Sequence, residues 1–81
     1  MARMNVGSYA EVKALLRAEG FAESDLPLLG KNEDGASVIL SAITDISDGS
    51  TAFKLETAQE NGWMRINIFY KDGTVEELYE R

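Results

Sequence analysis

The carboxylates are the side chains of this sequence best able to carry out chemistry. Among its 81 residues, 14 are Asp or Glu and 8 are Lys or Arg, and neither Cys nor His occurs. A chain without Cys or His has no thiolate nucleophile, no Ser–His–Asp triad, and no imidazole or thiolate metal ligand. Catalysis would have to use a carboxylate pair, as glycosidases do, or Lys, Tyr, Ser and Thr.

Two groups of carboxylates have the spacing to act together. Asp45 and Asp48 flank a turn, and Glu76, Glu77 and Glu80 share the last predicted strand. A glycosidase pair lines a cleft, with the pKa of one carboxyl group raised. One sheet with one helix offers little cleft, so we expect these groups to be solvated charges. The sequence therefore predicts a protein that is not an enzyme, with a small carboxylate-dependent enzyme as an alternative.

Two acidic turns superficially suggest calcium loops, over residues 32–35 and 45–50. Both lack the later bidentate Glu that such a loop needs. The seven glycines are isolated, and none precedes the Lys-Ser/Thr pair of a phosphate-binding loop. We therefore expect no metal and no cofactor.

A helix is predicted over about residues 8–19. Ser8 and Glu11 have the spacing of a capping box, and an apolar stripe at helical spacing follows them. Gly20 supplies the left-handed residue that ends a helix.

Residues 20–36 are expected to form a connector. Pro27 and Gly30 limit any helix there. Three leucines of this segment are too apolar to remain in water, and we expect them to lie across the end or a face of the sheet: Leu26, Leu28 and Leu29.

From residue 37 onward, apolar residues alternate as in β-strands. Three pairs favour two-residue type I′ hairpin turns: Asp48-Gly49, Asn61-Gly62 and Asp72-Gly73. They divide the chain into strands at about 37–46, 51–59, 63–70 and 74–80. The prediction is a single α+β domain over residues 1–81, with one helix packed on a four-stranded antiparallel meander.

Two-residue turns at these places assign the side chains to two faces. The face toward the helix would hold Val38, Leu40, Ala42, Phe53, Leu55, Met64, Ile66, Ile68, Tyr70, Val75 and Tyr79. The opposite face would still carry large apolar groups, namely Ile39, Ile43, Trp63, Phe69 and Leu78. Apolar surface that the helix leaves uncovered is typical of a contact surface.

The leading functional interpretation is a small acidic protein-binding module. Its predicted partner-binding residues are Trp63, Phe69, Leu78, Arg65, Glu56, Glu60, Glu76 and Glu80. In many protein interfaces, a few central aromatic residues contribute most of the binding energy and charged residues surround them. The net charge of −6 suits a basic partner, such as a protein that handles nucleic acid. Small phage and mobile-element inhibitors of nucleases are similar in size and charge.

Other interpretations of the same face remain open. The connector leucines could cover it, a second copy could stack on it as a homodimer, or bases could stack on Trp63 and Phe69. Direct nucleic-acid binding is not expected, because no cluster of Lys and Arg occurs.

A membrane span is not expected either. The longest apolar runs are three residues, against the roughly 20 that cross a bilayer. Without Cys and without a secretory signal pattern, a cytoplasmic location is expected.

Overall fold

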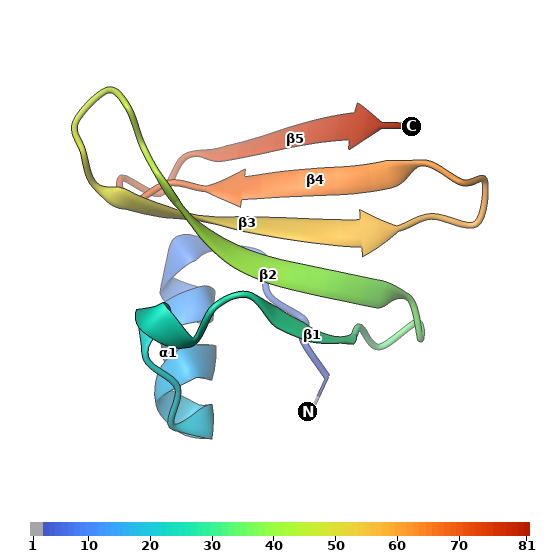
Figure 1. The fold of residues 1–81 in the computed structure, drawn as a ribbon, viewed down its shortest axis with the longest axis horizontal. Helices are drawn as coiled ribbons and strands as arrows, with labels where there is room; N and C mark the ends of the chain where they lie inside the picture. The colour runs from blue at the N-terminus through green and yellow to red at the C-terminus, as the bar shows by residue number, and fades with distance from the viewer. Residues whose placement is uncertain (1–2) are drawn as a thin grey trace.

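The computed structural model describes residues 3–81, which form one helix packed on one antiparallel sheet (Figure 1). The α+β class is confirmed, but the sheet has five strands rather than four, in the order β1-β2-β3-β4-β5. The elements are α1 (Tyr9–Glu19), the short 3₁₀ helix η1 (Glu23–Asp25), β1 (Leu28–Lys31), β2 (Ser37–Thr44), β3 (Thr51–Ala58), β4 (Met64–Phe69) and β5 (Val75–Glu80).

The ends of α1 are set by local hydrogen bonds, as the sequence predicts. The Ser8 hydroxyl accepts a hydrogen bond from the Glu11 backbone N–H at 3.1 Å. The Glu11 carboxylate reaches back to the N–H of Gly7 at 2.8 Å, one residue before the usual partner in a capping box. Gly20 has a φ of 76°, the left-handed conformation that ends a helix.

The prediction that residues 20–36 form only a connector is wrong in part, because this segment supplies the fifth strand, β1. Leu28 pairs with Leu40 of β2, and Leu29 pairs with Ile39. Leu28 and Leu29 therefore extend the sheet in its own plane instead of covering the outer face, and Leu26, before the strand, packs against the core. Pairing satisfies the backbone groups that β2 would otherwise leave open at an edge. The N-terminal segment continues this edge, since the Met4 N–H donates to the Lys31 carbonyl at 2.9 Å.

The predicted pairing of β3 with β4 is wrong by one residue. The Gln59 N–H donates to the Trp63 carbonyl, and the Gly62 N–H donates to Gln59, so the turn contains three residues rather than two. Gly62 has a φ of 85°, as in a type I turn followed by a glycine bulge. Phe53 consequently lies opposite Phe69 rather than Tyr70.

This slip exchanges the two faces of β4. Phe69 is turned toward α1 and is 2% exposed. Trp63 and Arg65 have the same strand parity and also lie on the α1 side, so their predicted place on the outer face is wrong. Met64, Ile66, Ile68 and Tyr70, predicted to face α1, lie on the opposite side.

The remaining strands keep their predicted faces. The turn between β4 and β5 also has three residues, closed by Tyr70 and Thr74, and this second slip restores the predicted orientation of β5. The turn between β2 and β3 has four residues, and its slip of two leaves the faces unchanged: Leu40 pairs with Leu55 rather than with Thr57.

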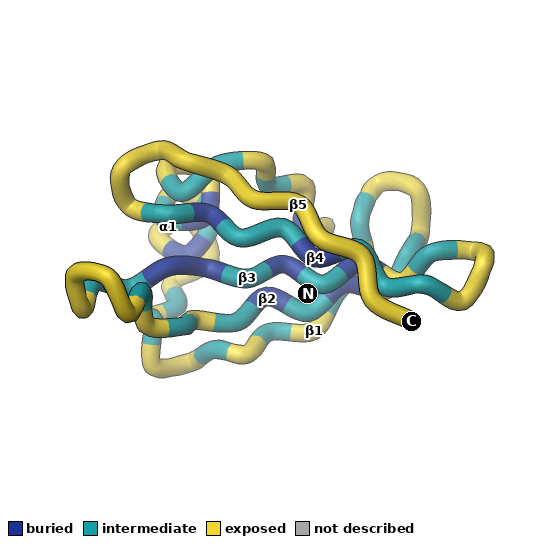
Figure 2. The backbone as a smooth tube through the Cα atoms, turned by 90° about the horizontal axis from the view of Figure 1, so that it is seen from above, coloured by how far each residue is buried: buried dark blue, intermediate teal, exposed yellow. Residues whose placement is uncertain are grey.

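The core lies between α1 and the sheet. Its buried members are Met4, Val12, Leu16, Val38, Leu40, Phe53, Leu55 and Phe69. Tyr9 of α1 packs on Phe53 with ring centroids 5.1 Å apart. Figure 2 shows that buried residues lie along β2, β3 and β4, whereas β5 is exposed along its whole length. The segment around Met4 bonds to β1 at one edge of the sheet, and the C-terminal strand β5 forms the other edge (Figure 1).

Phe53→Ala is expected to lower the free energy of unfolding by about 3–5 kcal/mol, because the ring is fully buried and its removal leaves a cavity. Val75→Ala, at a side chain that is 46% exposed, serves as the control and should cost less than about 1 kcal/mol. Urea denaturation of both variants measures the difference. Equal effects would contradict the assignment of Phe53 to the core.

Candidate functional site

The sheet surface opposite α1, called here the outer face, carries an apolar row that crosses all five strands. The pairing places Leu29, Ile39, Glu56, Ile66 and Leu78 side by side in that order. Four of the five side chains are aliphatic, and Glu56 stands at the centre. Cross-strand neighbours of this kind contact one another on one face of a sheet.

The adjacent row mixes charge with apolar surface. It runs from Ser41 through Lys54 and Ile68 to Glu76. The Lys54 ammonium lies 3.6 Å from the Glu56 carboxylate of the first row, and both side chains are partly exposed. An ion pair at such a surface contributes little to stability, and its charges remain available to a partner.

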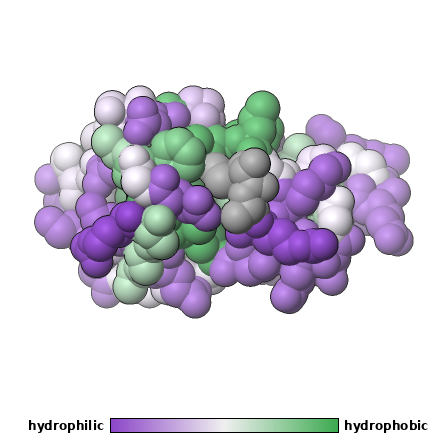
Figure 3. Space-filling model, turned by 90° about the horizontal axis from the view of Figure 1, so that it is seen from below, coloured by the Kyte–Doolittle hydropathy of each residue, from purple (hydrophilic) through white to green (hydrophobic). Residues whose placement is uncertain are grey.

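Exposure is greatest at the two ends of the apolar row. Leu29 is 69% exposed and Leu78 is 45% exposed, whereas Ile66 between them is 6% exposed. The helix and the N-terminal segment pack on the other side of the sheet. A space-filling view from the α1 and β1 side shows hydrophobic atoms in the middle of the molecule and hydrophilic ends (Figure 3).

Four predicted site residues lie on the outer face as expected: Leu78, Glu56, Glu76 and Glu80. Glu60 is exposed in the turn between β3 and β4. The structure brings Glu56 and Leu78 into one row and places Glu76 in the neighbouring one.

The other three predicted site residues are on the α1 side. Phe69 is buried in the core, so a partner cannot contact its side chain. Trp63 is half-buried, with the Arg81 guanidinium 5.5 Å from its ring centroid, a distance typical of a cation–π contact. Arg65 is half-buried and lines a hollow on the α1 side.

Sequence reasoning missed the contribution of β4 to the outer face. Met64, Ile66 and Ile68 take the places assigned to Trp63, Arg65 and Phe69. The alternation shows that these three aliphatic residues share one face. Only the length of the turn decides which face that is.

Two tyrosines, one directly after β4 and one on β5, donate hydrogen bonds to carboxylates of β5. Tyr70 donates to Glu76, and this bond is the main reason that its pKa is raised from 10.0 to about 12, with desolvation adding to it. Tyr79 donates to Glu77 at 3.1 Å on the α1 side of the sheet, and that bond likewise raises the pKa of Tyr79.

The acidic turns are held by hydrogen bonds to their own backbone. One Asp48 carboxylate oxygen accepts from both the N–H and the hydroxyl of Ser50, which lowers the pKa of Asp48. Asn32 accepts from the N–H groups of Asp34 and Ala36, which confirms a turn over residues 32–35. Within residues 3–81, no three Asp or Glu side chains converge as a metal-ligating group.

No protein-family model, curated protein or solved structure matches this chain. No helix within residues 3–81 combines the length and the apolar character needed to cross a bilayer.

Glu76→Gln is expected to bring the pKa of Tyr70 down toward 10.0, because the charged acceptor is replaced by a neutral one. In the wild type, the hydrogen bond that raises the pKa of Tyr70 makes its full contribution to the free energy of unfolding below pH 10. This contribution is lost as the pH rises toward 12 and the phenol ionises. NMR titration of ring-labelled tyrosine resolves each phenol. Glu77→Gln is the matched control, which should shift Tyr79 and leave Tyr70 unchanged. An unchanged pKa of Tyr70 in the Glu76→Gln variant would contradict the assignment of the shift to the hydrogen bond with Glu76.

Proposed function

We propose that this chain is a non-catalytic protein-binding module that docks its partner on the outer face. The row from Leu29 to Leu78 is the observation that supports this best, because β1, β2, β4 and β5 each place an aliphatic side chain on the face that α1 leaves open, with Glu56 of β3 between them. Such a row can pack against a complementary apolar surface, and its exposed ends extend the contact to both sheet edges.

The charges around the row favour a basic partner. Glu56, Glu76 and Glu80 share the outer face, and the chain has a net charge of −6. Carboxylates arranged on a stiff sheet complement the basic groove of a protein that binds nucleic acid. Inhibition of such a protein is the activity that this arrangement supports.

A self-associating module is the second candidate. Stacking two outer faces would bury the same aliphatic row twice. It would also bring the carboxylates of two chains of charge −6 together, whereas the strand residues of each outer face include two basic side chains, Lys31 and Lys54. Like charges oppose that contact.

The small carboxylate-dependent enzyme is the third candidate. Glu76, Glu77 and Glu80 are exposed along β5. Their exposure fits solvated charges better than a catalytic pair in a cleft.

Leu78→Ser is expected to weaken partner binding by about tenfold or more, because the substitution removes an apolar anchor at the exposed end of the row. Val75→Ser is the matched control, since Val75 lies on the same strand, on the other face, and is 46% exposed against 45% for Leu78. Partner captured from the native host with wild-type chain is titrated against both variants. Equal losses would contradict the outer face as the contact.

Analytical ultracentrifugation of the wild type separates this proposal from self-association. A monomer that binds a basic protein supports the proposal. A stable dimer that Leu78→Ser dissociates and that captures nothing else would contradict it.

Glu76→Lys is expected to slow association with a basic partner several-fold at low salt, and the difference should shrink as salt screens the charge. Glu77→Lys is the matched control, because the adjacent residue is equally charged and exposed but faces the other side of β5. Stopped-flow association rates at two ionic strengths measure the effect. Equal slowing by both variants would show that only the net charge matters and not the outer face.

A further inference from the structure

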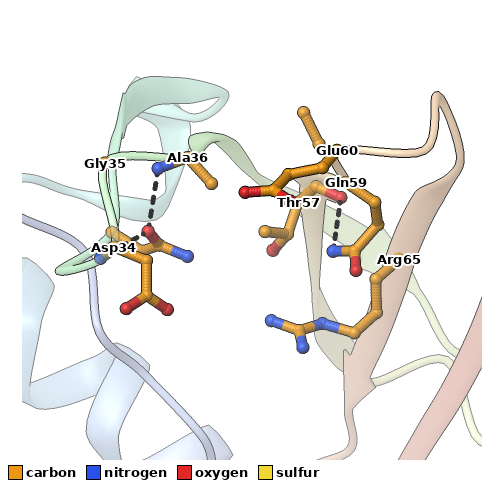
Figure 4. Close-up of a pocket in the computed structure, with 9 residues that line it drawn as sticks. Asp34, Gly35, Ala36, Thr57, Gln59, Glu60 and Arg65 are labelled. Carbon is orange, nitrogen blue, oxygen red and sulfur yellow. Dashed lines mark hydrogen bonds between the residues drawn. The ribbon is translucent and has the colours of Figure 1, made fainter.

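A polar hollow lies on the α1 side of the sheet, between two turns. The turn after β1 forms one wall, and the end of β3 with the following turn and β4 forms the other (Figure 4). Its volume is about 590 Å³. Sites for small molecules have volumes of about 300–1,000 Å³.

Thr57 of β3 places an unpaired hydroxyl in this wall. The residue is 2% exposed, and its Oγ1 has no hydrogen-bond partner among residues 3–81. A buried hydroxyl without a partner is uncommon in folded proteins. Thr57 also lines a second, smaller hollow that shares Asp34 and Arg65 with the first. A group entering here could give the hydroxyl its missing partner.

Arg65 of β4 places an unpaired cation beside Thr57. Its Nε is buried and has no hydrogen-bond partner within the described chain. Neither of the two ion pairs among residues 3–81 involves its guanidinium, although the chain has a net charge of −6. Figure 4 shows this group pointing across the hollow toward the side of Asp34. The Nε edge of a guanidinium can bind a carboxylate through two parallel hydrogen bonds.

The opposite wall carries the Asp34 carboxylate. Glu60 also lines the hollow, from the turn that follows β3, and neither carboxylate takes part in an ion pair among residues 3–81. With one guanidinium and two carboxylates, the hollow repels a dianion such as phosphate. A ligand with a negative group at one end and a positive group at the other matches both walls.

We propose that this hollow binds a small zwitterion, whose carboxylate pairs with Arg65 and Thr57 and whose ammonium group pairs with Asp34. The site lies on the face of the sheet opposite to the proposed protein contact. Either proposal can therefore fail without the other.

The test is an NMR titration of the full chain with glycine, β-alanine and γ-aminobutyrate, which separate the two charges by increasing lengths. Acetate, methylammonium and inorganic phosphate are the single-charge controls. The readouts are the Arg65 Nε–H signal and the Thr57 amide. One zwitterion should give saturable shifts and bind about tenfold or more tightly than acetate, because it gains a second charged hydrogen bond.

Three variants assign the contacts. Arg65→Gln should weaken zwitterion binding about tenfold or more. Asp34→Asn should abolish the preference for a zwitterion over acetate, because the ammonium group loses its partner while the anion loses a repelling charge. Arg17→Gln, on the exposed surface of α1, is the matched control and should change nothing.

Thr57→Val separates binding from folding. It removes the hydroxyl while keeping the shape, so it should weaken binding and leave the Tm unchanged or raised, since the hydroxyl makes no hydrogen bond in the described chain. Three outcomes would overturn the proposal: no saturable shift with any probe, which means that water alone fills the hollow; tighter binding of phosphate; or equal binding of zwitterions and acetate.

Discussion

The backbone hydrogen bond from the Gln59 N–H to the Trp63 carbonyl, 2.9 Å long, decides which face of β4 meets the helix. It closes a three-residue turn, and a turn one residue shorter would rotate every side chain of β4 to the other side of the sheet. Phe69 could then no longer lie opposite Phe53, where both rings are buried. The aromatic contacts of the core therefore depend on the length of one turn.

The same register creates both surfaces for which we propose binding. It turns Ile66 and Ile68 outward, so that Ile66 of β4 lies beside Leu78 of β5 and is separated from Ile39 of β2 by Glu56. It turns Arg65 inward beside Thr57, at the end of the sheet that holds the hollow. The apolar row and the polar hollow thus lie on opposite faces of the sheet, and both include residues of β3 and β4.

Features that depend on neighbouring residues could be predicted from the sequence. The limits of α1 follow from Ser8, Glu11 and Gly20, and the places of the three hairpin turns follow from their Asx-Gly pairs. The turn lengths could not be predicted, because an Asx-Gly pair fits a two-residue type I′ turn and also a three-residue turn with a glycine bulge. The prediction for β5 was right in its face although its pairing was wrong, since two successive slips of one residue cancel.

Features that depend on distant residues could not be found in this way. β1 has four residues, one of them Gly30, and it is a strand because β2 offers it an open edge. The candidate site was predicted in part. Glu56, Glu76, Glu80 and Leu78 are on strands whose faces were assigned correctly, while Trp63, Arg65 and Phe69 moved with the register of β4.

The two edges of the sheet bear on the choice between a second copy and a different partner. Every residue of β5 is exposed, so its outer backbone groups could pair with another strand. Pairing with the β5 of a second copy would bring the Glu76, Glu77 and Glu80 side chains of both chains together, and like charges on adjacent strands are destabilising. At the other edge, the N-terminal segment already bonds to Lys31. Both edges therefore disfavour pairing with a second copy of this chain. A partner with a basic strand or surface would instead be attracted by the carboxylates of β5 and of the outer face.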